Sequence, residues 1–236
     1  MHKIVYKILD KYFQNDYSNE LTALLEKSKE PLIIFDIGCY VGNFSRKIKK
    51  KLIHKKIDFH LFDPNPQLKI KDFLYNNVAF SNKKGNFDFH LNTFFPSSGS
   101  SLKTFVKDDK LWNLTRKIAT LSLFKSFKTF KVNVDLLDNY CKEKNISRID
   151  VLKIDVEGSE IEVLEGGVDI LKNTNIIQIE IFDTKKLQEE KVNKIKLMLF
   201  KLDFELKKIK PTWSSQQMSN TKSADALFVR KKISDF

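Results

Sequence analysis

The sequence predicts an α/β fold in which a mostly parallel sheet carries helices on both faces and ends in an antiparallel strand. Strand-length apolar segments alternate with segments in which apolar residues recur at helical spacing, as is typical of such folds. The last two predicted strands, residues 204–209 and 226–229, are joined by a polar loop without a helix. Because a parallel crossover needs a long connection, usually a helix, this ending predicts an antiparallel last strand.

Length and composition set the domain organisation. A chain of 236 residues with 42% apolar residues, among them 20 phenylalanines, is large enough for one packed domain. We assign residues 31–236 to this domain and residues 1–30 to an N-terminal helical extension. No apolar run approaches the ~20 residues that cross a membrane, and the N-terminus lacks a signal-type apolar core. We therefore expect a cytoplasmic protein without a transmembrane segment.

The formal net charge of +12 raises the question of a nucleic-acid partner. Nearly all of the positive charge is lysine, since the arginines are Arg46, Arg116, Arg148 and Arg230. The lysines are spread along the whole chain, so we expect no specific nucleic-acid partner. A lysine-rich binding protein for nucleic acid or another anionic polymer is the non-enzymatic alternative. The two cysteines, Cys39 and Cys141, form neither a disulfide framework nor a metal-ligand spacing.

The N-terminal extension carries two helical patterns. The first is an apolar stripe with lysines between its members, which are Ile4, Val5, Ile8, Leu9, Tyr12 and Phe13. The second is a helical piece with Leu21, Leu24 and Leu25. We expect the extension to pack on the domain. A contact to a membrane surface, or to a second copy in an oligomer, is the alternative.

A glycine turn after the first strand is the centre of the predicted fold. An apolar run from Leu32 leads into Asp36, Gly38 and Gly42 bracket a tight turn, and helical spacing follows to Leu52. Such a turn lies at the carboxyl edge of an open α/β sheet, where nucleotide-like ligands bind. Its glycines let the backbone come close to a ligand.

The spacing of this turn favours S-adenosylmethionine as the ligand. A dinucleotide fingerprint reads G-x-G-x-x-G, whereas here Tyr40 takes the place of the second glycine and Asp36 precedes the loop. A carboxylate would repel a pyrophosphate, but it suits the ammonium end of an amino-acid-bearing cofactor. The enzymatic alternative is a nicotinamide-dependent oxidoreductase. The structural alternative is a glycine turn without a ligand.

The second strand is predicted at residues 58–63 and ends in Asp63-Pro64-Asn65-Pro66. A carboxylate at this strand end is placed to bind ribose hydroxyls. A third strand at residues 77–80 leads into Ser81, and the alternating segment 87–91 reads as its hairpin partner. Residues 92–128 lack a regular pattern, so we expect an insertion that is either a lid or disordered.

The regular pattern resumes after the insertion. We expect strands at residues 130–134, 149–154 and 176–181, and helices at residues 136–144, 159–171 and 185–202. The strand at 149–154 continues into Lys153-Ile154-Asp155-Val156-Glu157-Gly158-Ser159-Glu160, where Lys153, Asp155 and Glu157 share one side. Charges that leave a buried strand must be paired or must face a cleft. A structural ion-pair network is therefore the alternative to a reactive site.

The chain resembles the FkbM family of methyltransferases. The residues that carry the resemblance occur in the family's order: Phe35-Asp36-Ile37-Gly38 with Gly42, Phe62-Asp63-Pro64, residues 134–140, residues 153–160, Glu165-Gly166 and Glu180. The resemblance implies a Rossmann-like class I methyltransferase fold with a seven-stranded sheet, S-adenosylmethionine as donor, and usually a hydroxyl oxygen as acceptor. Tyr40 stands where the family commonly has asparagine, and Asp63 replaces its usual glutamate.

These patterns together assign the site residues. For the cofactor we expect contacts from Asp36, Gly38, Cys39, Tyr40, Gly42, Asp63, Ala79 and Ser81. For catalysis we expect Asp155, with Lys153 and Glu180, to bind the acceptor or take its proton. Asp155 and Glu180 could instead hold a divalent cation such as Mg²⁺. His60 and His90 are further candidates for the base.

The acceptor is expected to be a sugar hydroxyl, in a glycan or a glycosylated small molecule. We expect the insertion at residues 92–128 to cover the acceptor site, because loops at strand ends determine substrate choice. Its serines can hydrogen-bond to hydroxyls, and Trp112 offers an apolar face to a sugar ring; the serines are Ser97, Ser98, Ser100 and Ser101.

Overall fold

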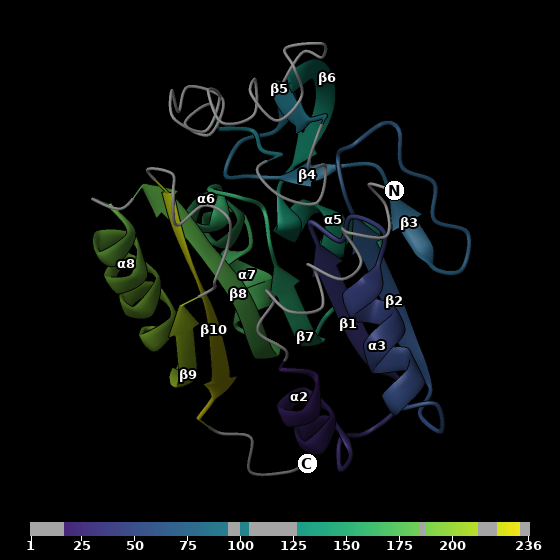
Figure 1. Cartoon of the computed structure of the whole chain (residues 1–236). Helices are drawn as coiled ribbons and strands as arrows, with labels where there is room; N and C mark the ends of the chain where they lie inside the picture. The colour runs from purple at the N-terminus through teal and green to yellow at the C-terminus, as the bar shows by residue number, and fades with distance from the viewer. Residues whose placement is uncertain (1–16, 94–99, 104–126, 185–186, 212–220, 232–236) are drawn as a thin grey trace, which may run out of the picture.

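The computed structural model describes residues 17–93, 100–103, 127–184, 187–211 and 221–231. A seven-stranded sheet runs through it in the order β3-β2-β1-β7-β8-β10-β9 (Figure 1). Its strands are β1 Leu32–Ile37, β2 Ile57–Phe62, β3 Leu74–Asn76, β7 Ile149–Ile154, β8 Thr174–Thr184, β9 Phe204–Pro211 and β10 Thr221–Arg230. Strand β10 is antiparallel to both of its neighbours, and the pairs among β3, β2, β1, β7 and β8 are parallel. The predicted mostly parallel sheet with an antiparallel last strand is confirmed.

Helices cover both faces of this sheet. The helices are α2 Ser18–Leu25, α3 Asn43–Lys51, α5 Leu137–Glu143, α6 Glu160–Glu165, α7 Val168–Leu171 and α8 Gln188–Phe200. Leu21 and Leu25 of α2 and Ile48 of α3 pack with Leu32 and Ile34 on one face. The other helices bury their apolar residues against the opposite face, which carries Phe35, Leu152 and Ile177. The alternation of side chains along each strand thus divides the core into two layers.

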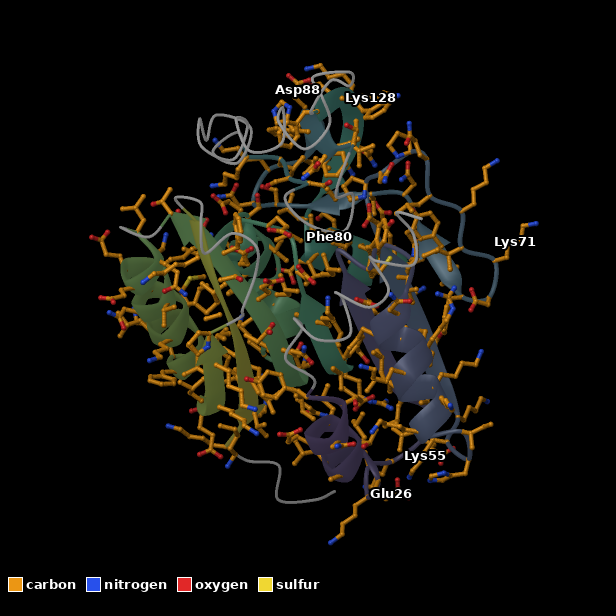
Figure 2. The ribbon with its side chains drawn as sticks, viewed as in Figure 1. Glu26, Lys55, Lys71, Phe80, Asp88 and Lys128 are labelled. Atoms are coloured by element: carbon orange, nitrogen blue, oxygen red, sulfur yellow. The ribbon has the colours of Figure 1, made fainter. Side chains whose placement is uncertain are left out.

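A second, three-stranded sheet stands over the carboxyl ends of β1 and β2 (Figure 1). Its order is β4-β6-β5, with β4 Ala79–Phe80, β6 Phe127–Asp135 and β5 Gly85–Asn92. Figure 2 shows Phe80 at the junction of the two sheets, where it is only 1% exposed, and Asp88 and Lys128 at the outer end of the β5–β6 ribbon. The small sheet therefore forms a wall above one edge of the large sheet.

The strand predicted at residues 77–80 forms only over residues 79–80, as β4, and its predicted hairpin with residues 87–91 does not form. Residues 79–80 pair with β6, and the outer neighbour of β2 is β3. Strand β3 has three residues, none of them buried, so it leaves no apolar pattern to detect. The segment 87–91 does belong to a hairpin-like antiparallel pair, but its partner is β6. A pairing between segments so distant in sequence depends on tertiary contacts.

The helix predicted at residues 159–171 is broken into α6 and α7 at Gly166 and Gly167. A Cβ atom at Gly166 would lie 2.1 Å from the carbonyl oxygen of Ser81, and one at Gly167 would lie 2.9 Å from a side-chain carbon of Leu137. These glycines allow the chain to approach its neighbours closely. The break is therefore set by packing against β4 and α5.

The N-terminal extension is only partly within the described residues. Helix α2 corresponds to the second predicted helical piece and packs on the sheet, whereas the apolar stripe between Ile4 and Phe13 lies outside the described part. Among the described helices, none is both long and apolar enough to span a membrane.

Candidate active site

A pocket opens at the carboxyl ends of β1, β2 and β7, and residues of the small sheet, Ala79, Phe80 and Phe89, line it as well. The three strand ends and the small sheet with its adjoining loop all contribute to its lining, which consists of Ile37, Gly38, Tyr40, Phe62, Asp63, Pro64, Asn65, Val78, Ala79, Phe80, Phe89, Ser100, Ser101, Leu102, Asp155, Val156, Glu157 and Ser159. Of the predicted site residues, Gly38, Tyr40, Asp63, Ala79 and Asp155 are therefore brought together. The charged groups in this described lining are carboxylates.

The glycine turn lets the ends of β1 and β7 meet. Gly38 has a φ of +76°, and a Cβ atom there would lie 1.7 Å from the carbonyl oxygen of Asp155. The Asp155 amide in turn donates to the carbonyl of Ile37 at 2.9 Å. Only glycine fits such an approach, so Gly38 sets where Asp155 stands. Tyr40 also has a positive φ, of 47°, which asparagine adopts more readily than tyrosine.

The amide groups of the turn are used within the protein. Those of Gly38 and Cys39 donate to the carbonyl of Phe62 at 2.9 and 3.1 Å, and that of Gly42 donates to the carbonyl of Cys39 at 2.7 Å. The Tyr40 amide donates to Oδ2 of Asp63 at 2.9 Å. A pyrophosphate site at a strand–turn–helix needs such amides directed at the ligand. This turn is therefore poorly suited to a dinucleotide.

Asp63 is a buried carboxylate that faces the pocket. Its side chain accepts the amides of Tyr40 and Asn65, each at 2.9 Å, and the residue is 8% exposed. Its carbonyl is fixed by the hydroxyl of Tyr75 at 2.9 Å and by Nδ2 of Asn77 at 2.8 Å. Burial raises the pKa of Asp63 to about 6, although the two amide hydrogen bonds oppose that rise. At neutral pH the carboxylate is ionised and rigidly held.

Asp36 lies beneath the turn and is not part of the described lining. It is fully buried. Its Oδ2 accepts the Ser45 hydroxyl at 2.7 Å, and its Oδ1 is 3.7 Å from Nζ of Lys153. Burial raises the pKa of Asp36. The carboxylate expected to hold the amino-acid end of the cofactor thus directs its contacts to α3 and Lys153.

Lys153, Asp155 and Glu180 form a contiguous charged group at the ends of β7 and β8. Nζ of Lys153 lies 2.9 Å from Oδ2 of Asp155, and the carboxyl groups of Asp155 and Glu180 are hydrogen-bonded to each other. A hydrogen bond between two carboxyl groups requires a proton on one of them. The predicted trio is therefore assembled, with Lys153 and Glu180 outside the pocket lining.

Of this pair, Glu180 is the carboxyl that retains a proton more readily. Burial raises the pKa of Glu180 well above its ordinary value, and the charges of Asp155 and Asp225 raise it further. Burial also acts to raise the pKa of Asp155, but Lys153 and the hydrogen bond from Glu180 outweigh it, so the pKa falls below its usual value. Burial would lower the pKa of Lys153, but Asp155 and Asp36 raise it overall. Asp155 is thus an ionised acceptor at the pocket.

The other predicted residues lie outside the described lining. Cys39 is buried under the turn, and burial raises the pKa of its thiol. Gly42 packs on the side chain of Leu61, and the Ser81 amide donates to the carbonyl of Asp135 at 3.0 Å.

Neither candidate histidine reaches the pocket lining. Nδ1 of His60 is 3.0 Å from the hydroxyl of Tyr140, within the aromatic part of the core. Nδ1 of His90 is 3.1 Å from the hydroxyl of Thr129 on the neighbouring strand. Both histidines are buried. Their side chains therefore serve contacts within the fold in this structure.

The pocket contains residues that the sequence did not indicate. Val78, Phe89 and Leu102 line its upper side, and only the alternation of residues 87–91 gave a signal that Phe89 would be buried on one face. Ser101 pairs with the backbone of His90 at 2.9 and 3.2 Å. Ser97, Ser98 and Trp112 lie outside the described residues, so the predicted cover over the acceptor site stays a prediction.

The structure also bears on a metal centre. Within the residues that the structure describes, no group of three or more His, Cys, Asp or Glu side chains is arranged to hold a metal ion. Nζ of Lys153, 2.9 Å from Oδ2 of Asp155, already supplies a positive charge to this carboxylate. The Mg²⁺ alternative thus finds no support in the described site.

Comparisons with known proteins identify the family. Residues 36–206 match the methyltransferase FkbM domain. The 2-O-methyltransferase NoeI of Sinorhizobium fredii is 29% identical over 180 residues, which are 70% of this chain and 68% of NoeI. The hexuronic acid methyltransferase AglP of Haloferax volcanii is 26% identical over 185 residues, 73% of this chain and 68% of AglP.

A solved FkbM methyltransferase from Methylobacillus flagellatus KT aligns over 92% of this chain and 49% of its own, with 10% identity and a TM-score of 0.48. The present chain thus spans about half the length of that structure. The match over residues 36–206 covers most of the chain and includes both strand-end carboxylates, Asp63 and Asp155. The chain belongs to the FkbM family of methyltransferases.

Proposed function

We propose that this methyltransferase uses S-adenosylmethionine to methylate a hydroxyl oxygen of a sugar, in a glycan or a glycosylated small molecule. The observation that carries the proposal is the pocket at the ends of β1, β2 and β7. Its charged groups are Asp63, Asp155 and Glu157, and the rest of its lining combines apolar side chains with a few neutral polar ones. Carboxylates attract a cofactor that carries a sulfonium and an ammonium group.

The residues present fit the parts of that cofactor. Both oxygens of Asp63 accept one amide each, and each keeps a further lone pair for a ribose hydroxyl. Phe62, Val78, Ala79 and Phe80 form an apolar surface beside Asp63 that suits an adenine ring. The amides of Gly38, Cys39, Tyr40 and Gly42 already donate within the protein, so these four are not directed at a dinucleotide. This donor set supports S-adenosylmethionine over the nicotinamide alternative.

The protein's own chemical task is small, because the bound cofactor supplies an activated methyl group. An acceptor hydroxyl that gained this methyl group would have to release its proton. Asp155 is ionised and held by Lys153 at 2.9 Å, so it can accept that proton or orient the hydroxyl. Glu180, as the protonated partner, donates to Asp155 and keeps it directed. The pocket must also exclude water and align the two reactants.

The sugar acceptor is supported by the named activities of the two relatives, a 2-O-methyltransferase and a hexuronic acid methyltransferase. Ser100 and Ser101 also line the pocket. Their hydroxyls can hydrogen-bond to a sugar. The net charge of +12, nearly all of it from lysine, also suits an acidic sugar.

Calorimetric titration with S-adenosylmethionine and S-adenosylhomocysteine tests the cofactor. We expect micromolar affinity, about −8 kcal/mol, and a loss of about 1–3 kcal/mol in Asp63→Ala, because ribose hydroxyls lose their acceptor. NAD is the control ligand. Folded protein that releases heat with NAD but with neither adenosyl ligand would contradict the proposal.

Transfer of a labelled methyl group tests the acceptor. Purified protein is incubated with methyl-labelled S-adenosylmethionine and either isolated glycans, total RNA or DNA. We expect the label in the glycan fraction, in a base-stable ether linkage that mass spectrometry locates on a sugar oxygen. Label confined to RNA or DNA, or in a base-labile methyl ester, would refute the sugar hydroxyl.

A further inference from the structure

Helix α8 buries a lysine among polar groups. Lys191 is only 7% exposed, although the sequence of α8 marks it as one of several surface lysines. Its Nζ donates to the carbonyls of Gly158 and Phe182, both at 2.7 Å. The same ammonium lies 2.6 Å from Oε2 of Glu160 and 3.4 Å from Oδ2 of Asp183. These four oxygen partners hold the buried ammonium group in one position.

The partners of Lys191 come from two different strand ends. Gly158 and Glu160 follow β7 a few residues after Asp155, and Phe182 and Asp183 follow Glu180 in β8. Asp155 and Glu180 are the two carboxyl groups that share a hydrogen bond. One ammonium from a third element thus links the segments that carry the pair. Lys191 itself is not among the described residues that line the pocket.

The segment between Asp155 and α6 has a backbone that needs support. Glu157 has a φ of +52° and Gly158 a φ of +118°, and a left-handed conformation is unfavourable for glutamate. The amide of Gly158 donates to Oε1 of Glu160 at 2.7 Å, and its carbonyl is held by Lys191. The ion pair between Lys191 and Glu160 therefore holds both the amide and the carbonyl of Gly158. Glu157 and Ser159, on either side, line the pocket.

We propose that Lys191 is a positioning residue of the methyltransferase site, which fixes the end of β7 against the end of β8. It thereby sets the separation of Asp155 and Glu180 and the placement of the pocket wall at Glu157. This inference rests on the proposed use of the adenosyl cofactor. Buried ion pairs contribute little net stability compared with apolar packing, so a gain in stability is a weak reason for Lys191 to be buried here.

Two variants and two controls separate positioning from stability. Lys191→Met removes the ammonium, and Lys191→Met combined with Glu160→Gln also removes the carboxylate left behind, while a side-chain oxygen remains for the Gly158 amide. Arg230→Met is the matched control, because Arg230 donates to the carbonyls of Thr174 and Leu202, both at 2.8 Å, at the opposite edge of the sheet. Lys194→Met, on the exposed face of α8, removes an ion pair with Glu165.

The readouts are the affinity for S-adenosylhomocysteine by calorimetry, the melting temperature, and amide hydrogen exchange of residues 155–162. We expect both Lys191 variants to bind about tenfold more weakly or worse, since small displacements in a site have large effects. The Gly158 amide should exchange faster in both. The double variant should recover melting temperature without recovering affinity. Arg230→Met should lose melting temperature but keep its affinity, and Lys194→Met should change neither.

The outcomes are distinct. If affinity follows melting temperature through all four variants, Lys191 only stabilises the fold and the inference is wrong. Failure of both Lys191 variants to fold would lead to the same conclusion. If the unmodified protein does not bind the probe, the proposed function fails. In that case, unchanged exchange at residues 155–162 in the Lys191 variants would overturn the positioning role as well, whereas faster exchange with a retained melting temperature would preserve it.

Discussion

Lowering the pH from 7 to 5 should weaken the binding of S-adenosylhomocysteine through the protonation of Asp63. Burial raises the pKa of this carboxyl to about 6, against the opposing effect of the amides of Asn65 and Tyr40. The ionised carboxylate offers lone pairs to the ribose hydroxyls, while each oxygen also accepts one amide. A proton added to either oxygen takes one of those lone pairs and turns an acceptor into a donor.

The expected magnitude follows from the fraction of ionised Asp63. With a pKa of about 6 in the empty pocket, about a tenth of the molecules are ionised at pH 5 and about nine tenths at pH 7. The apparent dissociation constant rises in inverse proportion to the competent fraction. Binding should therefore weaken about tenfold, which is about 1.4 kcal/mol. The ligand's own α-amino and α-carboxyl groups, with pKa values of about 8 and 3.5, change little in this interval.

The protonation of Asp63 that weakens binding should not unfold the protein. The pKa of this carboxyl is raised from 3.8 in the unfolded chain to about 6 in the fold, so the folded protein binds the proton more tightly. The corresponding stabilisation, at most about 3 kcal/mol, is fully present below the unfolded pKa and is lost as the pH rises through about 6. As far as Asp63 is concerned, the empty protein becomes more stable over the interval in which binding weakens.

Calorimetry at pH 7, 6 and 5 measures this effect, with two variants as controls. Asp63→Asn should bind weakly at all three values. Asp150→Asn should keep the pH dependence, because Asp150 is a buried carboxyl with a raised pKa at the opposite edge of the sheet, where it accepts the Ile33 amide. A dissociation constant that stays level between pH 5 and 7, or the same slope in Asp63→Asn, would refute the reasoning.

Three further predictions concern turnover. Asp155→Asn should keep its affinity for S-adenosylhomocysteine within a few-fold and lose about 10²–10⁴ of the methylation rate, because a general base is removed; a variant that stays active and only melts earlier would assign Asp155 to an ion-pair network. EDTA should leave the rate of methyl transfer unchanged, because Lys153 already neutralises Asp155 at 2.9 Å, and a rate lost to EDTA and restored by Mg²⁺ would show a metal centre. Replacing residues 104–118 with a short Gly-Ser linker, which spares the pocket-lining Ser100, Ser101 and Leu102, should preserve cofactor binding and abolish transfer; an unchanged rate in that variant would rule out this segment as the cover over the acceptor.

The sequence was most informative where a local pattern determines the structure. Buried strands such as the one that begins at residues 32–35 are visible as apolar runs, and the glycine turn at Gly38 is visible as a break between two periodicities. Because parallel strands end at one edge, Asp63 and Asp155 could be placed in one pocket from the sequence alone. Both residues line the same pocket in the structure.

The sequence was least informative where one segment depends on a distant one. Strand β3 is three residues long, and β4 is recognisable only from its pairing with Val134 and Asp135. Lys191 looks like a solvent-exposed helix lysine, since nothing near it in the chain reveals the carbonyls of Gly158 and Phe182. The placement of Asp36 is a different case. Its alternation with Ile34 puts both side chains on the face covered by α2 and α3, so the pattern itself directed Asp36 away from the pocket.

Asp63 and Asp155 differ in what surrounds them, so their pKa values shift in opposite directions. Asp63 is compensated only by neutral amides, so burial prevails and its pKa rises to about 6. Asp155 has an ammonium at 2.9 Å and a protonated neighbour, so these prevail over burial and its pKa falls. As the pH decreases, Asp63, which we propose to hold the cofactor, is therefore protonated before Asp155, which we propose to serve the acceptor. Lowering the pH should consequently weaken cofactor binding first, while Asp155 is still ionised.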